Sequence, residues 1–280
     1  MFTTIFLVFL FVLGAVAGSF INVVILRFNT GEDLYGRSKC ASCSRTLSWC
    51  ELFPIVSYIL ISGKCSTCRS KISLQYPLVE FAMASLFFLS ALKFPFFFVF
   101  SYQSLISYIL IVVIWSVLVI LTVYDFKHKI LPDIFVWSFV ILAVVWQFVQ
   151  ILFETLEFSV LNFLAGPILF LFFFSFWYVS DGKWMGFGDA KLSIGIGFFL
   201  GLVQGISAVV LAFWIGAAVA VSILLGQKLS RKLQNDGLSL YQKNITMKSE
   251  IPFGPFLLLG SVIVFFVNVD ILGLSALFKI

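Results

Sequence analysis

Charged residues are scarce in this sequence. Of its 280 residues, 11% are charged and 61% are hydrophobic, and the mean hydropathy is +1.12, whereas a soluble domain carries about a quarter charged residues. Histidine occurs once, as His128 between two lysines, which argues against a histidine-based catalytic triad. The composition excludes a soluble globular domain, a disordered chain and a secreted disulfide scaffold. It predicts an all-α polytopic membrane protein.

Eight apolar runs follow one another along the chain. They cover residues 4–26, 77–99, 104–124, 134–153, 158–180, 190–203, 206–226 and 253–276. A helix that crosses the hydrocarbon core needs about 20 apolar residues, so we expect about eight transmembrane helices. The run 190–203 is the shortest and contains three glycines, which predicts a short, bent or tightly packed helix. The alternative is that it forms one re-entrant element with the run after it.

Basic residues are confined to alternate loops. If the segment after the first run is cytoplasmic, the cytoplasmic loops hold 16 of the 18 lysines and arginines, and only Lys93 and Lys279 lie on the other side. Membrane proteins carry this excess of positive charge on the cytoplasmic side. The pattern predicts a multi-pass membrane protein with both termini outside and the segment after the first run in the cytoplasm. It also explains the net charge of +5 without nucleic acid as a partner.

The first run ends in Ala15-Val16-Ala17, which resembles the cleavage site of a signal peptide. No positive charge precedes the run, however, and a strongly basic segment follows it. This arrangement favours a retained membrane anchor over a cleaved signal peptide. We therefore expect three parts: a first transmembrane helix at 1–26, a polar loop at 27–76 and a seven-helix membrane core at 77–280.

The loop 27–76 contains all five cysteines of the chain. Four of them form two Cys-x-x-Cys pairs, namely Cys40, Cys43, Cys65 and Cys68. Two such pairs can complete a tetrahedron of thiolates around Zn²⁺. The loop is too small to fold on apolar burial alone, so bound zinc would supply its folding energy. A redox pair and an iron–sulfur site are the alternatives, and Cys50 is not expected to be a ligand.

Two aspartates lie at the ends of apolar runs on the predicted cytoplasmic side. Asp125 ends the run 104–124, and Asp189 opens the run 190–203 after Gly186 and Gly188. Ionisable groups at membrane depth are costly and are functional candidates. Two neighbouring carboxyl groups do not both ionise easily, so one would keep its proton while the other serves as a base. Such a pair could activate water for attack on a peptide bond, and the glycines would let an extended peptide approach closely.

Simpler interpretations exist for each acidic residue. Asp125 could be a solvated helix end and Asp189 an N-cap. N-capping also accounts for Asp133, which follows Pro132, and Asp181 lies where its run leaves the membrane. Spacing alone leaves these interpretations open.

The sequence resembles the bacterial type IV prepilin peptidases, the bifunctional leader peptidases and N-methyltransferases of type IV pilus and type II secretion systems. The resemblance extends over nearly the whole chain. It is carried by Asp125, the two cysteine pairs and five segments, Gly18–Arg27, Ile72–Glu80, Leu131–Asp133, Gly186–Leu192 and Ile251–Phe256.

This resemblance implies a membrane aspartic protease whose catalytic residues are Asp125 and Asp189. It implies cleavage of the leaders of prepilins and pseudopilins on the cytoplasmic side, and methylation of the new N-terminus with S-adenosylmethionine. Gly186, Gly188 and Lys191 are candidates for substrate binding or active-site support. No glycine-rich motif of soluble methyltransferases is present, so the sequence does not place the methyl donor. The rival functions are a membrane transporter, against which the sequence shows no inverted repeat, and a non-catalytic pilus assembly factor.

Overall fold

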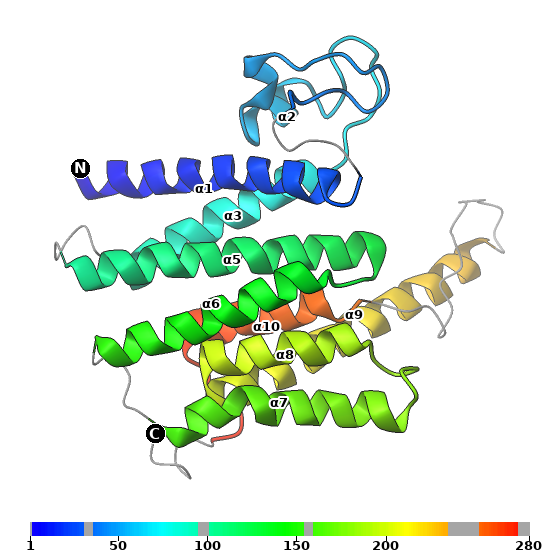
Figure 1. Cartoon of the computed structure of the whole chain (residues 1–280). Coiled ribbons are helices and arrows are strands. Elements are labelled where there is room, and N and C mark those ends of the chain that lie inside the picture. The colour runs from blue at the N-terminus through cyan, green and yellow to red at the C-terminus, as the bar shows by residue number, and fades with distance from the viewer. Residues whose placement is uncertain (1, 31–35, 95–100, 154–158, 235–251, 274–280) are drawn as a thin grey trace. The chain divides into compact units, whose positions relative to one another are not determined.

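The computed structural model describes residues 2–30, 36–94, 101–153, 159–234 and 252–273. Within these ranges the chain is built from helices, with two isolated β-bridges in the first loop. The elements are α1 (Phe2–Arg27), η1 (Trp49–Leu52), α2 (Val56–Leu60), α3 (Gln75–Lys93), α5 (Tyr102–His128), α6 (Asp133–Leu152), α7 (Val160–Val179), α8 (Phe187–Leu200), α9 (Leu202–Gln234) and α10 (Gly254–Val267) (Figure 1).

Six of the described helices are long and apolar enough to cross a membrane. They are α1, α3, α5, α6, α7 and α9. Helices α8 and α10 have 14 residues each, which corresponds to about 21 Å of helix against a hydrocarbon core of about 30 Å. The predicted all-α, multi-pass membrane fold is confirmed, with six helices of spanning length among the described residues where about eight were expected, and with α10 as a shorter apolar helix.

Helix α10 is shorter than the apolar run that predicted it. The run extends to residue 276, but the helix ends at Val267, because Asn268 adopts the left-handed conformation with φ 53° and its N–H caps the carbonyl of Val264. Asparagine tolerates this C-terminal conformation better than most residues. The end of that run, from 274, lies outside the described residues.

The helices are grouped into two compact units. Unit 1 comprises residues 1–124 and 132–158, and unit 2 comprises residues 125–131 and 159–280. The body of α5 therefore belongs to unit 1 and its last turn, from Asp125, to unit 2. This grouping does not test the expected division at residues 26 and 76, which stays a prediction.

In unit 1, α1 and α3 pack closely along one another. An ideal Cβ on Gly14 would lie 2.8 Å from the Cα of Ala84, and one on Gly18 would lie 2.7 Å from the Cα of Glu80. Within a membrane the hydrophobic effect does not drive helices together. Small residues at such crossings let two helix backbones pack closely instead. The side chain of Asn22 donates to the carbonyl of Tyr76 over 3.2 Å. The loop between these helices therefore starts and ends at a fixed place.

In unit 2, glycines allow α8 to pack tightly in the way the sequence predicts. An ideal Cβ on Gly197 would lie 2.5 Å from the backbone nitrogen of Gly166 in α7. Gly201, with φ 77°, is the single residue between α8 and α9. Because this conformation favours glycine, the chain turns sharply from one helix into the next. Unit 2 thus brings the start of α8 and the start of α10 together with the last turn of α5.

Candidate active site and metal centre

The two Cys-x-x-Cys knuckles of unit 1 have the same backbone structure, repeated 25 residues later. In each knuckle, the N–H of the first cysteine donates to the carbonyl of the residue five positions later. The N–H of the residue four positions later donates to the carbonyl of that cysteine. The bonds, of 2.9–3.0 Å, are Cys40 N to Arg45 O, Ser44 N to Cys40 O, Cys65 N to Ser70 O and Arg69 N to Cys65 O. An isolated bridge, Lys39 with Thr46 or Lys64 with Lys71, closes each knuckle.

This geometry brings the four predicted ligands together. Their sulfur atoms, on Cys40, Cys43, Cys65 and Cys68, all lie within 4.8 Å of one another. The Sγ atoms of Cys40 and Cys68 are 3.8 Å apart, close to the separation of about 3.8 Å that a tetrahedral zinc with Zn–S bonds of about 2.3 Å requires. The four cysteines therefore form a cluster that fits a metal ion.

Backbone amides of the first knuckle favour the thiolate form of Cys40, which is the form that metals bind, whereas the neighbouring thiols raise the pKa of Cys43. The backbone N–H groups of Cys43 and Ser42 lower the pKa of Cys40 to about 6, because a hydrogen bond to the charged form stabilises it. Cys50 is exposed and is not a member of the cluster.

Glu51 braces the two knuckles from the segment between them. Its Oε1 accepts from Arg45 Nη2 and from the hydroxyl of Ser66, both at 2.6 Å, and its Oε2 accepts from the N–H of Ser48 at 2.9 Å. The hydroxyl of Ser66, the amide of Ser48 and the guanidinium of Arg45 together lower the pKa of Glu51 to about 2. One carboxylate thus connects the first knuckle, the second knuckle and the start of η1.

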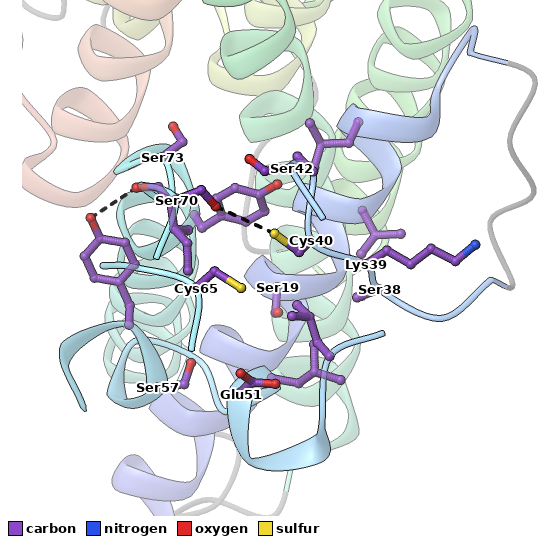
Figure 2. Close-up of a pocket in the computed structure, with 18 of the residues that line it drawn as sticks. Ser19, Ser38, Lys39, Cys40, Ser42, Glu51, Ser57, Cys65, Ser70 and Ser73 are labelled. Atoms are coloured by element: carbon purple, nitrogen blue, oxygen red, sulfur yellow. Dashed lines mark hydrogen bonds between the residues drawn. The ribbon is translucent and has the colours of Figure 1, made fainter. Parts of the chain in front are cut away.

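A cavity of about 990 Å³ lies between this loop and the ends of α1 and α3 in unit 1. Helix α1 contributes Ser19 and Arg27 to its wall, and α3 contributes Tyr76 and Glu80. Figure 2 shows further serines around it, together with the sulfur atoms of Cys40 and Cys65. The carboxylate of Glu80 is buried, and its Oε2 accepts from the N–H of Ile55 over 2.7 Å. The cavity is of the size that binds small organic molecules, and it combines hydroxyl groups, aromatic rings and a carboxylate.

Unit 2 brings the two predicted catalytic aspartates together. Asp125 lies in the last turn of α5 and Asp189 in the first turn of α8, and both are buried, with 6% and 9% of their surface exposed. The carboxyl groups are close enough for the charge of Asp125 to act on Asp189. The N–H of Gly254, at the start of α10, donates to Asp125 Oδ2 over 3.2 Å. Three helix ends therefore meet at one pair of acids.

Three glycines lie around this site, and at Gly254 a larger residue would collide with Asp125. An ideal Cβ on Gly254 would lie 2.6 Å from Asp125 Oδ2, and one on Gly188 would lie 3.1 Å from the Cβ of Leu131. Gly186 is the N-cap of α8, and its Cβ position is 3.7 Å from Asp189 Oδ2. Of these, the sequence analysis did not name Gly254 as a site residue. The available signal was a glycine between Phe253 and Pro255 at the start of the last apolar run.

Lys191 lies one half-turn after Asp189 on α8. Its Nζ is 5.0 Å from the centroid of the Phe187 ring, a distance typical of a cation–π contact. Residues two positions apart do not share a helix face, so Lys191 points away from Asp189, and its ammonium group has an aromatic neighbour in Phe187. Its predicted part in substrate binding stays a prediction.

Comparison with known proteins adds an independent line of evidence. Residues 12–94 match the family model of the bacterial peptidase A24 N-terminal domain, and residues 111–221 match that of the type IV leader peptidase family. A prepilin leader peptidase/N-methyltransferase of Vibrio cholerae is 30% identical over 272 residues, 94% of this chain and 97% of the relative.

Two further relatives carry the same name. That of Myxococcus xanthus is 30% identical over 226 residues, 80% of this chain and 65% of the relative, and that of Bacillus subtilis is 28% identical over 257 residues, 91% and 92% of the two chains. No solved structure matches the chain.

Proposed function

The chain belongs to the prepilin leader peptidase/N-methyltransferase family, and on that premise we propose that Asp125 and Asp189 cleave prepilin and pseudopilin leaders at the cytoplasmic face of the inner membrane. The observation that carries this proposal is the burial of both carboxyl groups at one place in unit 2. A pair of acids that share a buried site divides into one protonated and one ionised group. These are the two forms that acid–base hydrolysis of a peptide bond requires.

In this mechanism one carboxylate takes a proton from water, and the oxygen of that water adds to the scissile carbonyl carbon. The other carboxyl group donates a hydrogen bond to the carbonyl oxygen and supplies the proton that the departing amine takes up. The peptide bond breaks without a covalent enzyme intermediate. Gly254 lets the start of α10 lie directly against Asp125, where a Cβ would be 2.6 Å from Oδ2, and thereby helps to hold that carboxyl group in place. The apolar helix of the substrate would enter from the lipid, with its leader in the cytoplasm.

The four clustered cysteines would hold one Zn²⁺. Such an ion, bound by four thiolates, leaves no open position for a substrate and is structural. It would fix the two knuckles against each other and thereby shape the cavity next to α1 and α3. We propose that the zinc-bound loop contributes to methyl transfer and not to cleavage, because chemistry at the aspartates requires no thiolate.

The cavity of unit 1 is our candidate position for the methyl donor, S-adenosylmethionine. When bound, this molecule supplies a methyl group to the new N-terminal amine. Its sulfonium is positively charged and its amino-acid part carries a carboxylate, and the lining offers groups of both signs: Glu51 and Glu80 are acidic, and Arg27, Arg37, Lys39 and Lys71 are basic. The chain's own residues would bind the donor, exclude water and hold the amine. Ser19→Trp should fill the cavity and prevent binding of S-adenosylhomocysteine in equilibrium dialysis, whereas Phe20→Trp, at an exposed position of the same helix, should not.

Mass spectrometry of a prepilin tests the proposed function directly. Incubated with the purified protein, the prepilin should lose its leader, and with S-adenosylmethionine present the product should gain one methyl group. Cleavage without methylation would remove the second activity from the proposal. An intact prepilin in both samples would contradict the proposal as a whole, and is what a transporter or a non-catalytic assembly factor predicts.

A further inference from the structure

The loop of unit 1 exposes a set of large apolar side chains that no contact in its fold explains. We call this set the apolar shelf; it consists of Trp49, Phe53, Val56, Ile59 and Leu60. Trp49 and Leu60 are 79% and 78% exposed. They lie on the short helices η1 and α2 and on the segment between these helices, where Phe53 is extended and Ile55 has φ 63°. An exposed apolar patch of this kind marks an interaction surface.

A hydrogen bond fixes the depth of the shelf relative to α3. Ile55, between η1 and α2, donates its N–H to Glu80, which lies five residues inside α3. At a rise of about 1.5 Å per residue, the attachment point is about 8 Å from the start of that helix. Ile55 also has φ 63°, a rare conformation for a β-branched residue. Ile55 therefore has a strained backbone at the point where its N–H binds Glu80 of α3.

A contact with helix α1 indicates a similar depth for the shelf. Ser19, which also forms a hydrogen bond with Glu80, lies eight residues before the end of α1 at Arg27, or about 12 Å along the axis. Figure 1 shows α2 alongside α1 and not beyond its end. The shelf is therefore level with the last turns of a membrane helix. An interfacial helix buries its apolar face about 5–10 Å into the boundary between headgroups and acyl chains.

The neighbouring helices expose apolar residues at the same level. On α1 this residue is Phe20, and at the start of α3 they are Leu74, Leu78 and Phe81. Lipid that covers these side chains must extend to the level of Glu80. The shelf is thus continuous in depth with the lipid-facing surface of unit 1.

The charge of the loop also complements a membrane surface. Residues 36–73 contain six basic residues and one acidic residue, Glu51. Even with the net negative charge of a zinc tetrathiolate, the loop remains positive. Anionic headgroups attract such segments, by about 1 kcal/mol for each lysine or arginine near the surface. Trp49 at one end of the shelf is a residue type enriched at membrane interfaces.

We propose that the apolar shelf inserts into the lipid interface next to α1 and α3, so that the zinc-binding loop lies on an anionic membrane surface and is held there by lipid as well as by protein. The loop then has a lipid-anchored side at η1 and α2. Cleaved substrate, whose apolar helix stays in the membrane, would reach the cavity of unit 1 without leaving the interface.

Photo-crosslinking of the full chain in vesicles tests this position. The protein is reconstituted in phosphatidylethanolamine with phosphatidylglycerol, and benzoylphenylalanine replaces either Leu60 on the shelf or Thr67, which is exposed on the second knuckle. We expect lipid adducts at residue 60 in several-fold excess over residue 67, measured by mass spectrometry. Equal yields at the two positions, or crosslinks from residue 60 to a second copy of the chain, would overturn the proposal.

A substitution gives a second, independent measurement. Leu60→Glu should release η1 and α2 from the interface and speed hydrogen exchange of residues 49–60 in vesicles, with about one zinc per chain retained. Leu60→Met, which keeps an apolar side chain at the same position, is the matched control and should leave the exchange of residues 49–60 unchanged. Unchanged exchange in a zinc-loaded Leu60→Glu protein would contradict the lipid-anchored loop. These readouts need no catalysis, so they are independent of whether the prepilin assay succeeds.

Discussion

In the zinc-binding loop, Cys40 is held by a hydrogen bond to a residue five positions away, whereas Asp125 accepts its hydrogen bond from Gly254, 129 positions further along the chain. The loop is made of two local turns that a metal would join. The aspartate site is made of three helix ends that only the packing of unit 2 brings together. We therefore expect the loop to lose its structure when its cysteine ligands are removed, and the aspartate site to lose its activity when one of its three helices shifts.

The largest effect should come from removing either catalytic carboxyl group. We expect Asp125→Asn and Asp189→Asn each to reduce prepilin cleavage by at least about a hundredfold, the contribution typical of a positioned acid or base. Zinc content should not change, because the cysteines belong to unit 1. Cleavage is measured by mass spectrometry, with Asp133→Asn as the control. Full cleavage by either folded variant would refute the assignment.

The next effect concerns the backbone that approaches Asp125. Gly254→Ala would place a methyl group 2.6 Å from Asp125 Oδ2, so α10 or the carboxyl group must move. We expect cleavage to fall by roughly tenfold or more, which corresponds to about 1.4 kcal/mol of transition-state stabilisation. Gly226→Ala is the matched control, because a Cβ there meets nothing within 4 Å. Equal activity of the two variants would mean that the close approach of Gly254 is unimportant.

Loss of the metal ligands should affect the loop and spare the aspartates. Cys65→Ser with Cys68→Ser should lower zinc from about one ion per chain to nearly none, and should reduce methylation more than cleavage. Cys50→Ser should keep its zinc. Metal analysis and both activities are measured on the same preparations. Zinc retained by the double variant would reject this ligand set.

Pilin that has already been cleaved can be used to test whether methylation is independent of Asp125. Asp125→Asn abolishes cleavage, and with it methylation, since no free N-terminus appears. When already cleaved pilin is supplied, this variant should methylate it, because the cavity and the cysteines lie in unit 1. A folded Asp125→Asn protein that cannot methylate cleaved pilin would show that the two activities do not have separate sites.

The smallest effect should come from the brace between the knuckles. Glu51→Gln removes a carboxylate whose pKa is lowered to about 2 by Ser66, Ser48 and Arg45. Because the folded pKa is below the unfolded value of about 4.3, the carboxylate contributes stability above pH 4.3 and loses it as the pH falls toward 2. The variant should show faster hydrogen exchange in the loop at neutral pH. Its difference from the wild type should shrink below pH 4.3, and a constant difference would contradict this origin.

Much of the molecule could be predicted from the sequence. The apolar runs predicted the membrane helices, because a 20-residue apolar segment has few other stable environments. The cysteine spacing predicted the metal cluster, since a Cys-x-x-Cys turn of six or seven residues directs both thiolates to one point without help from the rest of the fold. The run with three glycines predicted the tight packing of α8, because a missing side chain is visible in the sequence itself.

The remainder was decided by tertiary structure. Gly254 became part of the site only because α10 begins against Asp125, and α10 ended at Asn268 only because that residue took a left-handed cap. Apolar residues between the two knuckles could form either a small core of the loop or its surface, and only the structure shows that those of the apolar shelf are exposed. Composition and spacing fix what a segment is able to do over a few residues. Contacts between residues more than a hundred positions apart depend on how the helices pack against one another, and no short segment of the sequence determines that packing.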